Sequence, residues 1–481
     1  MNNLHLGHRL GAVSTFPVQR AYKEQTLSSL RHDEQVTFSL ARLAGDIPPS
    51  ANVAHPNGVN CLAVRSDVLV TGGADACIRL WDLSSPNSTP STATYHPRAT
   101  LSRSPTGHTN ALTSISIYPF DPVPSTLVST SYDTNLLLTS ITPTSLVPAH
   151  TFPLQYAVHT HAISPIPTHS PLIAAGTASP AIRLLDLRSG LATHSLPGHN
   201  GAIYALAWSP KHSHVLASGA NDGRVLLFDV RRANAAFASL DLDDAIGVSA
   251  IEKNRLGGKT GQLLNYSSQA HTGPVTSVQW TSYPHEKLVT TGHDQRIRVW
   301  DSGNGRNELV HFGPRLKNTR LGPFGPLLAP AGYARKATQE VLLWANDDAR
   351  GEVGVFGLRE GDARGTMAVR GVHKGRVAKE REVDSLRGRG RINAMVWRED
   401  DGEGGGGRDG LEMISAHGDG TVGVWRIPEG DAGESAGDEV EGDGDQKNAG
   451  SWSAGENKKR KRQDFSALVE GLTKIKRVDA P

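Results

Sequence analysis

The stretch that decides the fold is NDGRVLLFDVRR at residues 221–232, a turn followed by a short apolar strand that ends in an acid and two arginines. The same pattern occurs in VTGGADACIRLWDL at 70–83, VTTGHDQRIRVWDS at 289–302 and ISAHGDGTVGVWRI at 414–427. A weaker copy is VSTSYDTNLLLTSI at 128–141. Repetition at this spacing indicates that the chain is built from copies of one small sheet.

Each copy has a Ser or Thr four places before its turn acid and, in most copies, an aromatic residue six places after it. The sets are Thr71/Asp75/Trp81, Ser129/Asp133/Thr139, Ser218/Asp222/Phe228, Thr290/Asp294/Trp300 and Ser415/Asp419/Trp425. Three copies also have a histidine upstream, in GHTNALTSISI, GHNGAIYALAW and AHTGPVTSVQW. This combination is typical of WD40 repeats.

The spacing predicts a structural role for these polar residues. A buried histidine that bonds the acid and the hydroxyl, with an aromatic N–H on the same hydroxyl, satisfies several polar groups at once and fixes the strand register. We expect two such tetrads at His199/Ser218/Asp222/Phe228 and His271/Thr290/Asp294/Trp300. Because an active site occurs once and these sets repeat, we interpret them as scaffold and expect no catalytic residue among them.

Two weaker repeats bring the number of units from five to seven. They are HAISPIPTHSPLIAAGTASPAIRLLDLRSG, with Ser179 in place of the turn acid, and EVLLWANDDARGEVGVFGL. The sequence therefore predicts an all-β, seven-bladed WD40 propeller over 34–428, with an N-terminal helical segment at 1–33 and a disordered tail at 429–481. The seventh unit lacks an outer strand, which EQVTFSLARL at 34–43 is expected to supply. Long loops are expected at 242–269, 302–338 and 375–390.

Metal, cofactor and nucleotide sites are not expected. Cys61 and Cys77 are the only cysteines and lie in separate strands. LGGKTGQ at 256–262 lacks the first glycine of a phosphate loop. HTH at 159–161 has no evident third ligand, and successive strand positions point to opposite faces.

The overall charge is balanced, with 50 Lys and Arg against 48 Asp and Glu, so direct binding of nucleic acid is not expected. No apolar run reaches the roughly 18 residues of a membrane span. The tail has eight acids at 429–445 and then KKRKR, which is typical of a nuclear localisation signal. That signal consists of Lys458, Lys459, Arg460, Lys461 and Arg462.

Residues 196–241 and 270–313, with the phrases SPKHSHVLAS and SGNGRNELVHFG, closely resemble the fourth and fifth blades of the Cockayne syndrome group A family. Residues 158–190 resemble the third blade. The resemblance implies a non-catalytic substrate receptor of a cullin-4 RING ubiquitin ligase in transcription-coupled nucleotide excision repair. The implied partners are the large damaged-DNA-binding adaptor, cullin-4 and its RING subunit indirectly, and repair factors or stalled RNA polymerase II as substrates.

The family docks through a Trp-Asp-x-Arg strand ending and an N-terminal helix. The resemblance assigns adaptor binding to Asp229, Arg231, Asp186 and Arg188, although neither ending has the family Trp. At the N-terminus it assigns Leu4, Leu6 and Leu10, where Gly7 and Gly11 disfavour a long helix.

Two alternatives stay open. One is a nuclear WD40 scaffold that assembles chromatin or RNA-processing complexes and is not part of a ubiquitin ligase. The other is direct recognition of damaged DNA, for which residues 359–391 hold ten bases against five acids.

Overall fold

The computed structural model describes most of the repeat region of the chain. The described residues are 27, 29–40, 53–84, 87–88, 93–167, 172–232, 236–242, 268–281, 286–313, 316–319, 321–330, 340–347, 351–368, 391–398 and 411–427. The chain divides into two units, Met1–Ala432 and Gly433–Pro481, and the second unit lies wholly outside the described residues. No described helix has the length and apolar character needed to span a membrane.

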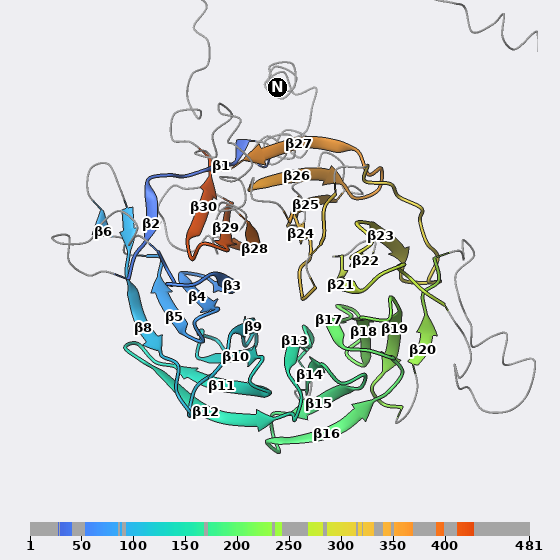
Figure 1. Cartoon of the computed structure of the whole chain (residues 1–481), viewed down its shortest axis with the longest axis horizontal. Helices are drawn as coiled ribbons and strands as arrows, with labels where there is room; N and C mark the ends of the chain where they lie inside the picture. The colour runs from blue at the N-terminus through green and yellow to red at the C-terminus, as the bar shows by residue number, and fades with distance from the viewer. Residues whose placement is uncertain are drawn as a thin grey trace, which may run out of the picture. The chain divides into compact units, whose positions relative to one another are not determined.

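Seven antiparallel sheets surround a central channel, which confirms the predicted seven-bladed propeller (Figure 1). Blade 1 consists of β3 (Val59–Arg65), β4 (Val68–Gly73), β5 (Ile78–Asp82) and β8 (Pro97–Leu101). Blade 2 consists of β9 (Leu112–Ile117), β10 (Thr126–Ser131), β11 (Asn135–Ile141) and β12 (Leu146–Pro153). Blade 3 consists of β13 (Val158–Ile163), β14 (Leu172–Thr177), β15 (Ile182–Asp186) and β16 (Leu191–Leu196).

The other four blades follow in chain order around the ring. Blade 4 consists of β17 (Ile203–Trp208), β18 (Val215–Ala220), β19 (Val225–Asp229) and β20 (Ala236–Ser239). Blade 5 has three described strands, β21 (Val275–Trp280), β22 (Lys287–Gly292) and β23 (Ile297–Asp301). Blade 6 consists of β24 (Leu327–Leu328), β25 (Val341–Ala345), β26 (Glu352–Gly357) and β27 (Ala363–Ala368). Blade 7 consists of β28 (Ile392–Arg398), β29 (Glu412–His417), β30 (Val422–Arg426) and β1 (Arg31–His32).

The second strand of a blade is buried along almost its whole length, as in β4, β10, β18 and β22. Both of its faces lie against neighbouring blades, so its sequence is a continuous run of small and apolar residues such as VLASGA, without polar alternation. Consecutive turns of an antiparallel blade lie alternately on the two faces of the ring. We call the face with the turn acids Asp75, Asp133, Asp222 and Asp294 the turn face, and the opposite face, where third strands end at Asp82, Asp186, Asp229 and Asp301, the strand-end face.

Side chains from the innermost strands join neighbouring blades around the channel. Trp208, Trp280 and Trp397, each at the end of an inner strand, donate their indole N–H to Ala162, Ala207 and Leu328 carbonyls at 3.1, 3.1 and 2.7 Å. Between blades 7 and 1, Asn393 Nδ2 donates to Val59 O at 2.7 Å. These bonds satisfy inner-strand carbonyls and hold adjacent blades in register.

The closing strand of blade 7 differs from the prediction. β1 pairs with β30, Arg31 opposite Arg426 and His32 opposite Trp425, so residues 31–32 close the ring and not 34–43. Within the predicted segment, β2 (Val36–Phe38) pairs in parallel with β7 (Ala93–Tyr95), which pairs with β6 (Asn87–Ser88). The alternation of Val36 and Phe38 correctly indicated one buried face, but Phe38 packs on Trp81 of blade 1, with ring centroids 5.2 Å apart.

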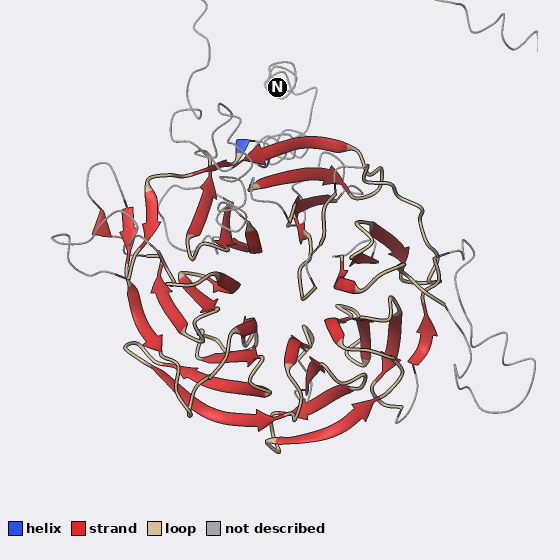
Figure 2. Cartoon of the chain, viewed as in Figure 1, coloured by secondary structure: helices blue, strands red, loops and turns tan. Residues whose placement is uncertain are grey.

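The described residues do not support the predicted N-terminal helical segment. Only Leu27 and Ser29 have helical backbone there (Figure 2), and every other described element is a strand, turn or loop. Leu27 and Leu30 are buried in the core cluster that includes Trp425, so the packed ring begins before residue 34. Blade 6 also differs: the predicted loop at 302–338 contains β24, and β27 adds a fourth strand to the two that were expected.

Gly420 sits where blade 7 meets blade 1, and its substitution tests the closure. Its carbonyl accepts from Ala54 N at 2.9 Å and from His55 N at 3.1 Å. Its φ is +90°, and an added Cβ would lie 2.0 Å from the His55 carbonyl oxygen. We expect Gly420→Ala to lower the free energy of unfolding by ~2–5 kcal/mol in chemical denaturation, through left-handed strain and overpacking.

The matched control is Gly365→Ala in β27, where a Cβ would meet nothing within 4 Å. That change should stay within about 0.5 kcal/mol. Equal effects of the two substitutions would contradict the described closure.

Candidate functional site

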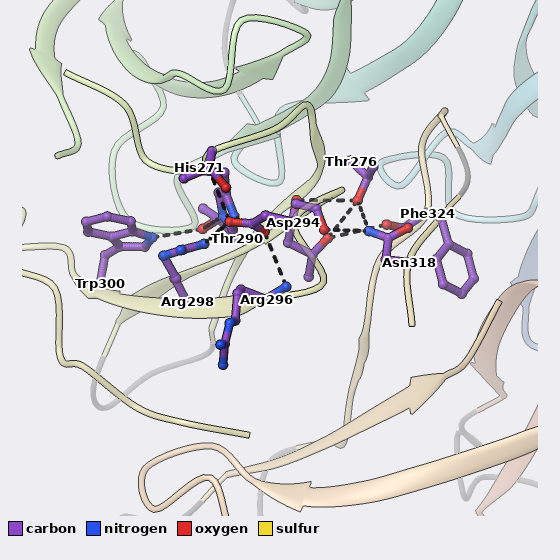
Figure 3. A network of polar contacts seen from close by, with 12 residues as sticks. His271, Thr276, Thr290, Asp294, Arg296, Arg298, Trp300, Asn318 and Phe324 are labelled. Carbon is purple, nitrogen blue, oxygen red and sulfur yellow. Dashed lines mark hydrogen bonds and ion pairs between the residues drawn. The ribbon is translucent and has the colours of Figure 1, made fainter. Parts of the chain in front are cut away.

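The polar network of blade 5 contains the second predicted tetrad (Figure 3). His271 Nδ1 lies 3.0 Å from Asp294 Oδ1, and His271 Nε2 lies 2.8 Å from Thr290 Oγ1. Trp300 Nε1 donates to the same Thr290 oxygen at 2.9 Å. The network therefore joins four parts of one blade: the loop before the first strand, the second strand, the turn after it and the third strand.

An arginine that was not part of the predicted tetrad joins this network. Arg298 Nη1 donates to Asp294 Oδ2 at 2.8 Å. Although burial raises the pKa of the Asp294 carboxyl, the His271 hydrogen bond and the Arg298 charge lower it overall, and burial lowers the pKa of His271 below 6.5. The stable state at neutral pH is an ionised Asp294 beside a neutral imidazole.

Blade 1 repeats this arrangement with a histidine that the sequence analysis missed. His55 Nδ1 lies 2.9 Å from Asp75 Oδ1, His55 Nε2 lies 2.8 Å from Thr71 Oγ1, and Trp81 Nε1 donates to Thr71 at 3.0 Å. Burial opposes ionisation of Asp75, but His55 and Arg79 bring its pKa down to about 2. The stretch AHPNGVNCLAV resembles AHTGPVTSVQW, so the signal for His55 was present in the sequence.

Blades 2 and 4 keep the histidine but have no tryptophan. In blade 4, His199 Nε2 lies 2.7 Å from Ser218 Oγ and His199 Nδ1 lies 3.3 Å from Asp222, while Phe228 fills the aromatic position without an N–H. In blade 2, His108 bonds Asp133 and Ser129 at 2.9 and 2.8 Å. The hydroxyl of Thr139, at the aromatic position, is buried without a partner among the described groups.

Blade 7 uses a different histidine. His417 Nε2 lies 2.9 Å from Ser415 Oγ, which also accepts from Trp425 Nε1 at 2.9 Å. Asp419 accepts from the Thr421 backbone N at 3.0 Å and from its hydroxyl at 2.6 Å. The repeated polar sets thus act as structural hydrogen-bond networks that differ in detail from blade to blade.

The strand-end acids form local turns. Asp82, Asp186, Asp229 and Asp301 accept from the backbone N two residues later, at Ser84, Arg188, Arg231 and Gly303, with distances of 3.0, 2.9, 3.1 and 2.9 Å. Such side-chain turns stop a strand and start the reversal. Since four blades share this contact, Asp186 and Asp229 have a structural role that does not depend on a partner.

Arg231 folds back onto its own strand-end acid. Its Nε and Nη2 donate to the two oxygens of Asp229 at 2.9 and 2.7 Å. This paired contact lowers the pKa of Asp229 to about 2. The Arg231 side chain is 65% exposed and that of neighbouring Arg232 is 69% exposed, so two guanidinium groups face solvent on the strand-end face of blade 4.

The other predicted contact residues are placed as follows. Arg188 is exposed on the strand-end face of blade 3, next to blade 4. Leu4, Leu6 and Leu10, and the basic cluster Lys458, Lys459, Arg460, Lys461 and Arg462, lie outside the described residues. The structure therefore brings the two Asp-x-Arg endings onto one face.

The two histidines of HTH at 159–161 have separate surroundings. His159 packs between the rings of Tyr132 and Tyr204, with centroid distances of 5.7 and 5.0 Å. His161 is fully buried, and its Nε2 lies 2.9 Å from Ser116 Oγ of blade 2. Among the described residues, no three His, Cys, Asp or Glu side chains are grouped to hold a metal ion.

A cavity of about 510 Å³ is lined by residues of blades 3, 4 and 5 and by residues 323–325. Its lining includes Tyr204, Trp208, Gln279, Trp280 and Phe324, and no charged side chain. The indole N–H groups of both tryptophans are used between blades, but the lining also includes Thr160, Ser277 and Gln279, so the cavity offers both polar and apolar surface.

Comparison with known proteins identifies the repeats. The WD40 family, described as WD domain, G-beta repeat, matches residues 49–82, 99–139, 190–229 and 263–301. These ranges contain the polar networks of blades 1, 2, 4 and 5. The chain thus contains WD40 repeats and folds as a seven-bladed β-propeller.

Similar proteins have several names. WD repeat-containing protein ATCSA-1 of Arabidopsis thaliana is 30% identical over 257 residues, 43% of this chain and 56% of that protein. Ribosome biogenesis protein ytm1 of Aspergillus clavatus is 27% identical over 281 residues, 53% of this chain and 55% of that protein. Histone acetyltransferase type B subunit 2 of Debaryomyces hansenii is 28% identical over 159 residues, 31% and 34% of the two chains. The chain spans little more than half the length of the first two.

Two substitutions in blade 5 separate a lost hydrogen bond from an uncompensated charge. Trp300→Phe removes one donor to Thr290 and makes blade 5 resemble blade 4, so we expect a loss of ~1 kcal/mol in the free energy of unfolding. Asp294→Ala leaves the largely buried side chain of Arg298 (13% exposed) without its carboxylate and should cost ~3 kcal/mol. Urea denaturation measures both. A smaller effect of Asp294→Ala than of Trp300→Phe would contradict the network.

His161 predicts a dependence of stability on pH. Burial lowers its pKa to about 4, against about 6.5 in an unfolded chain. The folded state therefore holds His161 neutral, and its contribution is complete above pH 6.5 and falls by up to ~3 kcal/mol as the pH drops towards 4. We therefore expect the denaturation midpoint of His161→Gln to fall less than that of wild type when the pH is lowered from 7 to 4.5. Parallel pH profiles of the two proteins would contradict this assignment.

Proposed function

We propose that this propeller is a non-catalytic scaffold that assembles chromatin or RNA-processing complexes in the nucleus. The observation that carries the proposal is the use of the histidine, hydroxyl and carboxylate groups in repeated structural networks, such as that of His271, Thr290 and Asp294. What varies between blades is the set of exposed side chains on the two faces. A rigid ring with variable faces suits the binding of several proteins at once.

The names of similar proteins support this assignment. One is called a ribosome biogenesis protein and another a subunit of a histone acetyltransferase, and both names describe assemblies with RNA or chromatin. The basic run KKRKR at 458–462 supports nuclear import. On this proposal the chain contributes binding surfaces and no bond-making chemistry.

A second candidate is a substrate receptor of a cullin-4 RING ubiquitin ligase in transcription-coupled repair. The likeness to ATCSA-1 and the strand ending Phe228-Asp229-Val230-Arg231 favour it. Arg231 lies on the strand-end face with its side chain 65% exposed, where a partner can reach it. On this candidate, Arg231 exchanges part of its contact with Asp229 for an acid of the damaged-DNA-binding adaptor.

A direct titration of the full-length chain with the purified adaptor separates the two candidates. For the scaffold we expect no binding to the adaptor, and enrichment of RNA-processing or chromatin factors when the tagged chain is purified from nuclei. For the ligase receptor we expect binding that Arg231→Glu weakens by ~2–5 kcal/mol, because the reversal places like charge at the interface.

Arg232→Glu is the matched control, since Arg232 is equally exposed and lies next to Arg231. Both variants should unfold within about 0.5 kcal/mol of wild type. Adaptor binding that only Arg231→Glu removes would contradict the scaffold proposal and establish the second candidate. If the chain binds neither the adaptor nor any nuclear complex, both candidate functions are excluded.

A further inference from the structure

Blade 3 has kept one member of the polar network and lost the rest. Arg183 lies opposite Ala175 in the β14–β15 ladder, as Arg79 lies opposite Thr71 and Arg298 opposite Thr290. Four residues before Arg183 stands Ser179, where the other two blades have Asp75 and Asp294. Blade 3 therefore presents the arginine of the network without its carboxylate.

The equivalent arginines show what this position does when an acid is present. Arg79 Nη1 and Arg298 Nη1 donate to Asp75 and Asp294 at 2.9 and 2.8 Å. For Arg183, the described part of the chain provides no hydrogen bond or ion pair, although its side chain is partly buried. A partly desolvated guanidinium gains free energy from a carboxylate that accepts two of its N–H groups.

Arg183 sits at the rim between blades 2 and 3. Its ladder partner Ala175 packs in the cluster that contains Leu154, and His161, opposite Ala175 in the next strand, bonds Ser116 of blade 2. Side chains directly opposite one another in a sheet point to the same side, so Arg183 lies on the side of blade 3 that carries Ala175 and His161 and packs against blade 2 and Leu154.

The loop that enters blade 3 is short. Residues 154–157 connect β12 to β13, whereas residues 102–111 enter blade 2 and residues 197–202 enter blade 4, carrying His108 and His199 over their turn acids. In blade 3, Tyr156 is 53% exposed, and Ala178 N donates to Ala157 O at 2.9 Å, which ties the loop to the Ser179 turn. No histidine of this loop covers the position of the missing acid.

We propose that blade 3 binds an acidic side chain of a partner protein on the turn face, with Arg183 holding the carboxylate in the place that Asp75 and Asp294 occupy in blades 1 and 5. The Ser179 hydroxyl and the exposed Tyr156 ring lie in the turn and loop that border this position. A planar guanidinium favours a carboxylate over a neutral amide, which gives the site its preference for Asp or Glu. The inference rests on the proposed function only in that the ring binds proteins.

The test uses the full-length chain and a fluorescein-labelled octapeptide of alternating Glu and Ser, followed by anisotropy. The Gln counterpart of the peptide and a single-stranded octanucleotide are titrated in parallel. We expect the Glu peptide to bind at least about tenfold more tightly than the Gln peptide, the loss that removal of one charged hydrogen-bonded pair gives. We expect Arg183→Gln to have no effect on the signal from the oligonucleotide.

Two variants reach the same result by different routes. Arg183→Gln removes the cation, and Ser179→Asp restores the internal acid at the spacing of Asp75 and Arg79, so each should weaken the Glu peptide at least about tenfold. Ser179→Asp should also raise the thermal midpoint, which shows that it folds and that its acid has occupied the site. Arg232→Gln, at an exposed arginine on the strand-end face of blade 4, is the matched control and should leave binding unchanged.

Equal binding of the Glu peptide by wild type, Arg183→Gln and Ser179→Asp would overturn the proposal, as would no binding of that peptide by wild type. Binding of the oligonucleotide that requires Arg183 and exceeds that of the Glu peptide would replace it with a nucleic-acid site. If the Glu peptide does not bind but the chain still captures nuclear complexes, the proposed blade 3 site is wrong and the scaffold function is unaffected.

Discussion

The hydrogen bond between a buried imidazole and a Ser or Thr hydroxyl is the contact on which the rest of the ring depends. In blade 5 the His271 to Thr290 bond, at 2.8 Å, joins the loop entering the blade to the second strand, and the same hydroxyl receives Trp300 from the third strand. Since side chains in a strand alternate between faces, a slip of one residue would turn Thr290 and Trp300 away from His271. The network thus fixes strand register, and register fixes which side chains reach each face.

Once these networks are recognised as scaffold, the differences between blades become informative. Blades 1 and 5 neutralise the turn acid with Arg79 and Arg298, whereas Leu137 and Leu226 stand at that place in blades 2 and 4. Blade 3 has the arginine without the acid. On the opposite face, strand-end acids make the same turn in four blades, while the residue two positions later changes from Ser84 to Arg188, Arg231 and Gly303. A constant frame with varied residues is what a protein-binding platform requires.

The sequence predicted the parts of this structure that have a local signal. The tetrads of blades 4 and 5 were expected from residue spacing within one repeat. That of blade 5 forms in full, whereas blade 4 forms the histidine bonds without an aromatic N–H, because Phe228 has no donor. The closing strand did not follow, because β1 has two residues, too few to show any periodicity, and its partner β30 lies almost 400 residues away. Val36 and Phe38 alternate as a strand should, but alternation does not specify which sheet edge a strand joins. The sequence showed Ser179 in place of the turn acid, but it did not single out Arg183, because the role of this position follows only from the contacts that Arg79 and Arg298 make with Asp75 and Asp294.

The most direct test of this account is the protonation and tautomeric state of the buried imidazoles, measured by ¹H–¹⁵N NMR of histidine-labelled protein across pH 4–8. An ionised carboxylate can only accept, so we assign the hydrogen to His271 Nδ1, 3.0 Å from Asp294, and the hydroxyl of Thr290 then donates to Nε2. Arg298 Nη1, which lies 2.5 Å from the same Nδ1, then donates to Asp294 Oδ2. We predict that His55 and His271 are neutral with hydrogen on Nδ1 at pH 7 and titrate below pH 6.5, because burial lowers the pKa of each. Titration of these imidazoles near pH 6.5, or hydrogen on Nε2, would contradict the structural role of the repeated networks.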